Sequence, residues 1–259
     1  MEWSTRTVDT GGGPFVVHET GDGPASVLYL HDELSSRPGS VATRLAAGAR
    51  VVAPVHPGFG EAGRPEWVES VRDVAEHYVD LLDMLALPTG TAVVGASMGA
   101  WIGTELAIRT GCPFVALSLV SPLGIRVPGY PPKDLWFARN PEELLLAHPE
   151  AMPEVPAAER VANEESAARY GWAPRLHDPT LAPRLHRLTA PVQLVWGTHD
   201  QLLPKEYLDA WRELLPTPEI AEIPTAGHFP GYERPDRTAD AIAEFLARST
   251  VTAERGEQS

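Results

Sequence analysis

Hydrophobic residues follow two different spacings along the chain, one typical of strands and one of helices. Short apolar runs without alternation suit strands that are buried on both faces of a sheet. Such runs occur at residues 26–30, 51–53, 92–94, 114–120 and 192–196, with a weaker one at 219–223. Before them, two β-rich stretches at 4–8 and 15–19 flank a Gly-Gly-Gly-Pro sequence. This arrangement predicts an N-terminal hairpin.

Between the strand-like runs, apolar residues keep the 3.6-residue period of a helix. In residues 68–87 this period is carried by Val71, Val74, Tyr78 and Leu81. Similar patterns predict helices at residues 41–47, 100–109, 206–215 and 237–247. Alternating strands and helices predict an α/β fold: a mostly parallel central sheet with helices on both faces.

This alternation stops between residues 125 and 188. The segment has many prolines, several short helical patches and no strand-like run, and it is rich in aromatic residues and leucine. Because disordered segments are poor in such residues, we predict a helical lid inserted into a core domain of residues 1–124 and 189–249. Residues 250–259 have the composition of a disordered tail.

Charge and cysteine content narrow the classes of function. The formal net charge is −14, which argues against nucleic-acid partners and against anionic membranes. No apolar run approaches the roughly 20 residues that span a bilayer, and the N-terminus does not resemble a signal peptide. Cys112 is the single cysteine, so no disulfide within the chain is expected. We therefore expect a cytoplasmic protein that acts on a small molecule; the sequence does not predict the oligomeric state.

A lone serine stands between glycines where the strand at 92–94 meets the next helix. Residues 95–99 read Gly-Ala-Ser-Met-Gly, and Gly-x-Ser-x-Gly between a strand and a helix is the pattern of a nucleophile elbow. Such a turn exposes the Ser97 hydroxyl at the carboxyl edge of the sheet, where ligands bind in open α/β sheets. The alternative is a glycine-rich turn that happens to contain a serine.

A nucleophilic serine needs a base, and the base needs an acid that orients it. Asp200 follows the strand-like run at 192–196, and His228 follows the run at 219–223. All three residues thus lie just past the carboxyl ends of strands, in the order Ser97, Asp200, His228. This order predicts a catalytic triad.

With Ser97 in GASMG, Asp200 in WGTHDQLLP and His228 in AGHFPGYERP, the chain resembles the α/β-hydrolase superfamily, in its lidded single-chain branch. The resemblance extends from about residue 15 to residue 247. It implies an oxyanion hole formed by the backbone N–H groups of Met98 and Glu33. Neither a cofactor nor a metal ion is expected.

Two positions depart from the family pattern. Asp32 follows His31 where a glycine is usual, and His56 precedes Pro-Gly-Phe-Gly where an acidic residue is usual. A carboxylate near a developing oxyanion opposes catalysis, so the site must turn it away, pair it with a cation or keep it protonated. We hypothesise that Glu33 borders the pocket mouth and disfavours anionic substrates. The alternative is that Asp32 and Glu33 both face solvent.

Several other residues have structural interpretations. We expect His31 to pack under the oxyanion loop, His199 to be a loop residue, Trp101 to pack in the core, and Glu233 to hold the histidine loop. A metal site built from His31, Asp32, His56, Asp200 and His228 is a competing hypothesis. No His-x-x-x-His or His-x-His spacing supports it.

These features favour a serine hydrolase that cleaves an ester, or a thioester, lactone or activated amide, of a small to medium, mostly apolar substrate. The proposed substrate-binding residues are Asp32, Phe59, Trp136, Trp172 and Phe229. One alternative is a carbon–carbon bond hydrolase, a lyase or another non-hydrolytic enzyme of the same fold. Another is a binding protein with an inactive site. Dehalogenases and epoxide hydrolases are disfavoured, because they need aspartate at the position of Ser97.

Overall fold

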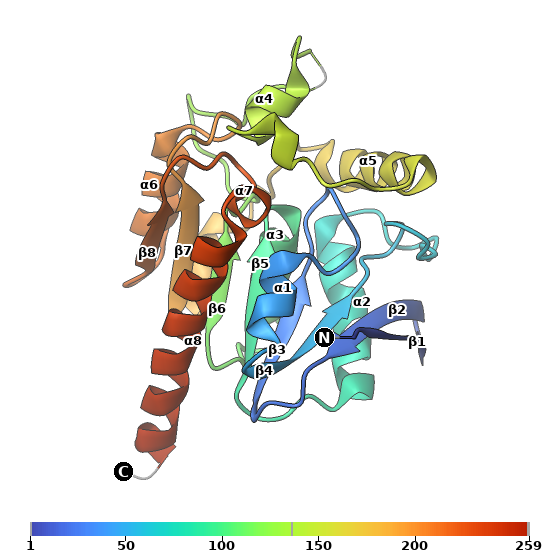
Figure 1. Ribbon diagram of the computed structural model, residues 1–259, viewed down its shortest axis with the longest axis vertical. Coiled ribbons are helices and arrows are strands. Elements are labelled where there is room, and N and C mark those ends of the chain that lie inside the picture. The colour runs from blue at the N-terminus through green and yellow to red at the C-terminus, as the bar shows by residue number, and fades with distance from the viewer. Residues whose placement is uncertain (1, 136, 258–259) are drawn as a thin grey trace.

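The computed structural model describes residues 2–135 and 137–257, and an eight-stranded sheet forms its centre (Figure 1). The strands lie in the order β1-β2-β4-β3-β5-β6-β7-β8. They are β1 (Ser4–Thr10), β2 (Gly13–Thr20), β3 (Ala25–Leu30), β4 (Ala49–Pro54), β5 (Thr91–Ala96), β6 (Leu117–Val120), β7 (Val192–Gly197) and β8 (Glu219–Ile223). The first two strands form the predicted antiparallel hairpin, β2 pairs antiparallel with β4, and the remaining pairs are parallel.

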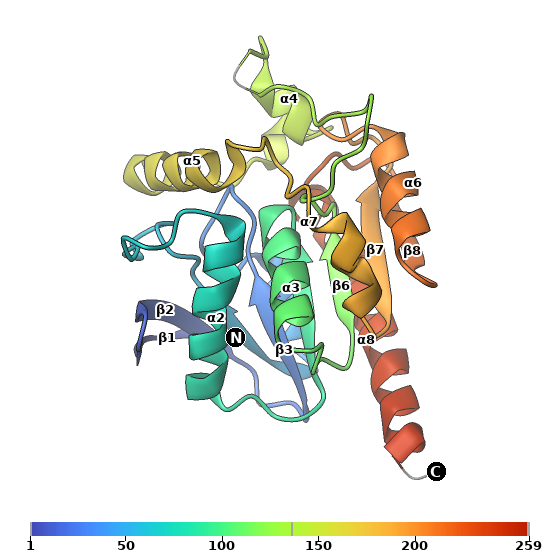
Figure 2. The same cartoon turned by 180° about the vertical axis from the view of Figure 1, so that it is seen from behind.

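Helices cover both faces of this sheet, as the sequence pattern predicts. Helices α1 (Ser40–Leu45) and α8 (Pro235–Glu257) pack on one face, and α2 (Val71–Leu85), α3 (Met98–Arg109) and α6 (Lys205–Leu214) lie on the other (Figures 1 and 2). Two separate clusters of buried apolar side chains fill the layers between sheet and helices. The short helix α7 (Pro230–Glu233) precedes α8.

Two elements differ from their predicted bounds. Strand β6 begins at Leu117 rather than at residue 114, although the backbone N–H of Val115 already donates a hydrogen bond to the Thr91 carbonyl of β5. Helix α8 continues to Glu257, so residues 250–257 are helical and not the expected disordered tail. Extending an existing helix needs no new nucleation, and Ala253, Glu254 and Arg255 favour helix. Residues 258–259 lie outside the described residues.

The segment between β6 and β7 consists of short helices joined by loops where the structure describes it. It contains α4 (Pro141–Leu145), η1 (Pro149–Ala151), α5 (Ala157–Gly171) and η2 (Ala182–Arg187). Figure 1 shows α4 and α5 beyond the carboxyl ends of the parallel strands, above the sheet. The helical insertion is thus placed over the edge where Ser97, Asp200 and His228 are predicted to meet.

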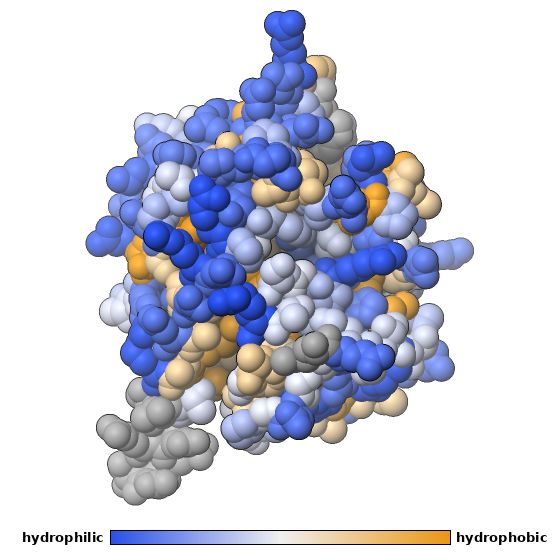
Figure 3. Space-filling model, in the orientation of Figure 1, coloured by the Kyte–Doolittle hydropathy of each residue, from blue (hydrophilic) through white to orange (hydrophobic). Residues whose placement is uncertain are grey.

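The molecular surface is predominantly polar on the face that carries α1 and α8. Figure 3 shows hydrophilic residues spread over this face, with hydrophobic residues in small separate patches. Among the described helices, none is long and apolar enough to cross a membrane.

Candidate active site

Ser97 occupies a strained turn between β5 and α3, with φ 50° and ψ −112°. Glycines on both sides make this turn possible. A Cβ at Gly95 would lie 2.6 Å from the carbonyl oxygen of Gly99, and a Cβ at Gly99 would lie 2.3 Å from that of His31. A side chain at either position would force these backbones apart. The glycines therefore let α3 start directly against the end of β3, with Ser97 at the sheet edge.

The three residues of the predicted triad are in hydrogen-bonding contact. Ser97 Oγ lies 2.9 Å from His228 Nε2, and His228 Nδ1 lies 2.8 Å from Asp200 Oδ2. The other oxygen of Asp200 accepts hydrogen bonds from the backbone N–H groups of Leu202 and Leu203, each at 2.9 Å. These bonds fix the carboxylate, which holds the proton of His228 on Nδ1 and leaves Nε2 facing the serine.

Glu233 holds the loop that carries His228. Its Oε2 accepts a hydrogen bond of 2.6 Å from Gly227 N–H, and its Oε1 accepts one of 2.8 Å from His148 N–H. The backbone N–H of His228 itself donates to the carbonyl oxygen of Leu145 at 2.9 Å. The predicted structural role of Glu233 is confirmed, and it links the histidine loop to the segment between β6 and β7.

Two neutral histidines form the base of the oxyanion loop. His31 Nδ1 donates to the carbonyl oxygen of Asp32 at 2.7 Å, and its Nε2 accepts from the backbone N–H of His56 at 2.9 Å. His56 Nε2 donates to the His31 carbonyl at 3.0 Å, so its Nδ1 accepts from the Tyr78 hydroxyl at 2.7 Å. Burial lowers the pKa of His31 to about 4 and that of His56 well below its ordinary range. His31 packs as predicted, and uncharged hydrogen bonds replace those of the usual acid.

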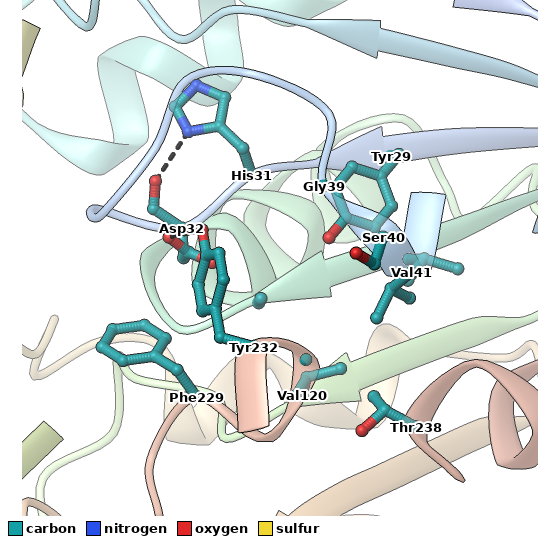
Figure 4. Close-up of a pocket in the computed structure, with 13 residues that line it drawn as sticks. Tyr29, His31, Asp32, Gly39, Ser40, Val41, Val120, Phe229, Tyr232 and Thr238 are labelled. Atoms are coloured by element: carbon teal, nitrogen blue, oxygen red, sulfur yellow. Dashed lines mark hydrogen bonds between the residues drawn. The ribbon is translucent and has the colours of Figure 1, made fainter. Parts of the chain in front are cut away.

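Asp32 is buried and its carboxylate turns back into its own loop. Asp32 Oδ1 accepts hydrogen bonds from Leu34 N–H at 2.8 Å and from the Tyr232 hydroxyl at 3.0 Å. Figure 4 shows Asp32 beside the Tyr232 ring, with His31 bonded to its backbone. These bonds stabilise the turn that a glycine would otherwise make. The alternative in which Asp32 faces solvent is wrong, because its side chain is enclosed.

Glu33 points at the nucleophile. Its Oε1 lies 2.9 Å from Ser97 Oγ, and its Oε2 is buried without a hydrogen-bond partner among the described residues. Burial raises the pKa of Glu33 to about 7, and the nearby charge of Asp32 adds to this shift. Glu33 lines the cavity, with its carboxyl group beside Ser97, and its expected effect on anionic substrates stays a prediction.

A cavity of about 400 Å³ opens on Ser97. Its lining is mostly apolar and includes Met98, Glu33 and Phe229 of the predicted site. Sequence reasoning missed its remaining walls, which come from loops after the strands and from the segment between β6 and β7. These include Leu34, Leu123, Leu135, Leu145, Met152 and Leu176. Arg160, Glu142 and Glu164 also line the cavity.

Three proposed substrate-binding residues lie elsewhere. Asp32 does not line this cavity, for the reason given above. Phe59 is fully buried and packs against the rings of His31, His56 and Tyr170. Trp172 is 61% exposed on the outer surface. Trp136 lies outside the described residues. Aromatic character alone did not distinguish side chains that line the cavity from those that fill the core or cover the surface.

Trp101 and His199 lie where the sequence predicts them. Trp101 is buried in the core, as predicted, and His199 lies in the loop after β7 with its side chain exposed. Within residues 2–135 and 137–257, no three His, Cys, Asp or Glu side chains are grouped as metal ligands.

One face of α5 is hydrogen-bonded to the two loops beside the oxyanion site. Glu159 accepts from the N–H and hydroxyl of Ser36 and from Arg37 Nε at 3.3, 2.9 and 3.2 Å. Asn163 accepts from Gly60 N–H at 2.9 Å and donates to the Leu34 carbonyl at 3.3 Å. Farther along the same face, Ser166 and Tyr170 donate to the carbonyls of Gly58 and Pro57 at 2.7 and 2.8 Å. Their spacing of four, three and four residues is the signal that could have identified this face.

Comparisons with known proteins show the family and the fold that this chain shares. A sequence model of the alpha/beta hydrolase family matches residues 17–241. A 2-hydroxymuconate semialdehyde hydrolase from Pseudomonas sp. strain CF600 is 27% identical, over 96% of this chain and 92% of the relative. Lipase 1 from Psychrobacter immobilis is 26% identical, over 82% of this chain and 74% of the relative. A serine hydrolase from the polyaromatic hydrocarbon-degrading bacterium Cycloclasticus zankles has a TM-score of 0.78 at 18% identity, covering 95% of this chain and 98% of that one. This last likeness shows a shared fold.

Proposed function

Since this chain belongs to the alpha/beta hydrolase family, we propose that it is a serine hydrolase that cleaves an ester of a small to medium, mostly apolar and uncharged substrate. The proposal includes thioesters, lactones and activated amides, because a serine nucleophile attacks the carbonyl carbon of each in the same way. The observation that carries the proposal is the unbroken chain of contacts from Asp200 through His228 to Ser97, which ends at a largely apolar cavity.

The reaction follows from these contacts. Ser97 Oγ attacks the carbonyl carbon while His228 Nε2 takes its proton, and Asp200 stabilises the imidazolium that forms. The N–H groups of Met98 and Glu33 would hold the oxyanion; loss of one such donor typically costs about 3 kcal/mol of barrier. His228 then returns the proton to the leaving alcohol. A water molecule, activated in the same way, hydrolyses the acyl-enzyme.

Carbon–carbon bond hydrolysis is a second candidate. It is favoured by the relative from Pseudomonas, which aligns over nearly the whole of both chains and is named for hydrolysis of a muconate semialdehyde. A muconate carries a carboxylate group, and in this chain Arg160 is the cation that lines the cavity. The same lining also includes the acidic residues Glu142 and Glu164, so Arg160 gives the cavity no net positive charge, which is why the neutral ester is preferred.

Ser97→Ala tests the proposal. The substitution removes the nucleophile and leaves a smaller side chain in the same turn. We expect hydrolysis of a panel of neutral 4-nitrophenyl esters to fall at least about a thousandfold. A fluorophosphonate probe should label wild type and fail to label the variant. Ester hydrolysis that survives in Ser97→Ala at more than about a thousandth of the wild-type rate contradicts the mechanism. Labelling without ester turnover would instead favour carbon–carbon bond hydrolysis.

A further inference from the structure

The Ser97 hydroxyl lies between two groups that compete for its single proton. Glu33 Oε1 is on one side and His228 Nε2 is on the other, each 2.9 Å from Ser97 Oγ. His228 Nδ1 already donates to Asp200. Ser97 can donate only one hydrogen bond, so both contacts exist together only when Glu33 or His228 Nε2 carries a further proton.

The position of that proton decides whether the triad can work. If it is on His228, the imidazole is a cation with no lone pair left to accept the proton of Ser97. If it is on Glu33, the carboxyl group donates to Ser97 Oγ, and Ser97 donates to a neutral His228. The second arrangement has the base ready and the nucleophile oriented, so it is the working form.

The surroundings of Glu33 favour the neutral carboxyl group. Its Oε2 has no hydrogen-bond partner, and Glu33 forms no ion pair with Lys or Arg among the described residues. The charged or titratable groups near it are Asp32 in its own loop, Tyr232 bonded to Asp32, and His228 with Asp200 behind it. Arg160, Glu142 and Glu164 line the same cavity. Burial of a carboxylate without a partner is costly, and this cost raises the pKa of Glu33 to about 7.

We propose that Glu33 is a catalytic residue that works as a neutral acid, donating a hydrogen bond from its carboxyl group to the carbonyl oxygen of the substrate while Ser97 attacks. This inference rests on the proposed esterase function. The carbonyl oxygen must lie close to Ser97 Oγ during attack, which is the space that the Glu33 carboxyl group already borders. The proton stays on Glu33, and no bond to Glu33 forms. A neutral carboxyl group in an apolar site is an effective donor to a developing oxyanion.

Ionisation of Glu33 reverses its effect. The carboxylate has no proton to donate and places a negative charge beside the oxyanion. The rate should therefore fall on the alkaline side as the proton shared by Glu33 and His228 is lost, and on the acid side as His228 gains a proton. Because the two groups are coupled, the two limbs belong to the pair.

Glu33→Gln and Glu33→Leu separate the hydrogen bond that the Glu33 side chain donates from the negative charge that it carries when ionised. The test measures kcat for 4-nitrophenyl butanoate between pH 5 and 9. Wild type should show both an acid limb and an alkaline limb. Glu33→Gln keeps an N–H donor but cannot ionise, so we expect a rate within about tenfold of wild type and no alkaline limb. Glu33→Leu should lose about 100-fold in kcat. Glu61→Gln, an exposed position outside the cavity, is the matched control and should keep both limbs.

Two results overturn the inference. A Glu33→Leu variant as fast as wild type would mean that the carboxyl group only occupies space that the substrate needs. An alkaline limb that persists in Glu33→Gln would assign that limb to another group. The rate of fluorophosphonate labelling, measured over the same pH range, separates this inference from the proposed function. If the labelling rate of wild type falls on the alkaline side and that of Glu33→Gln does not, the result supports the role of Glu33 even if esters are not turned over.

Discussion

Helix α5 should control the oxyanion loop through Glu159, and replacing this residue tests that dependence. The Glu159 carboxylate is 6% exposed and is the acceptor for both the N–H and the hydroxyl of Ser36. Glu159→Ala leaves these two donors without their acceptor in a buried place. A hydrogen bond to a charged group contributes about 1.5–3 kcal/mol. Since the N–H contact is long at 3.3 Å, we expect a loss of about 3 kcal/mol from the free energy of unfolding.

The loss should also appear in catalysis. Ser36 lies three residues from Glu33, so loosening it moves the backbone N–H and the carboxyl group that face Ser97. A displacement of about 1 Å near reacting groups can cost about 100-fold in rate. Glu159→Gln keeps an oxygen for Ser36 and loses only the contact with Arg37, whose side chain is 63% exposed. For that variant we expect a loss of about 1 kcal/mol or less and nearly normal kcat.

Urea unfolding followed by tryptophan fluorescence gives the stability change, and hydrolysis of a neutral ester gives kcat. The matched control is Glu165→Ala, which lies on the same helix with a side chain that is 70% exposed. Its effect should stay within about 0.5 kcal/mol. The reasoning is refuted if Glu159→Ala costs no more stability than Glu165→Ala and leaves kcat unchanged.

Two further predictions concern pH. Burial alone would lower the pKa of His228, but the charge and hydrogen bond of Asp200 oppose this effect, and the pKa is raised from 6.5. Asp200→Asn should therefore move the acid limb of kcat/KM down while reducing the rate about 10⁴-fold. An unmoved limb would count against this assignment. Burial lowers the pKa of His31 from 6.5 to about 4, so below pH 6.5 the unfolded chain binds a proton that the folded protein does not. The protein should therefore lose about 3 kcal/mol of stability as pH falls from 6.5 to 4. Urea unfolding at pH 7 and 4.5 should show a smaller drop in the free energy of unfolding for His31→Gln than for wild type. An equal drop in both proteins would contradict this role of His31.

The triad could be predicted from the sequence because parallel strands bring their carboxyl ends to one edge. Ser97, Asp200 and His228 each follow a strand-like run, so correct strands were enough to bring them together. The elbow added a second constraint, since the glycines on either side of Ser97 meet backbone atoms that leave no room for a side chain.

The walls of the cavity could not be predicted in the same way. They come from a segment whose path no strand fixes, and Phe229 is the one proposed substrate-binding residue among the described residues that lines the cavity. Phe59 and Trp172 are both aromatic, yet one fills the core and the other is exposed. The direction of the Glu33 side chain was equally open, because it depends on how the loop is fixed by residues far away in the sequence.

Those distant contacts explain how the site tolerates a carboxyl group beside its nucleophile. The oxyanion loop is held by the His31–His56 pair from below, by Tyr232 through Asp32, and by Glu159 and Asn163 from α5. With the loop fixed on these sides, Glu33 cannot relieve its burial by moving the backbone into solvent. It is left with two responses, to ionise beside His228 or to hold a proton. A loop with glycine at position 32 and an apolar residue at position 33 would have no carboxyl group that must ionise or hold a proton. Asp32, which stands where the family usually has glycine, therefore fixes the loop that presents Glu33 to Ser97.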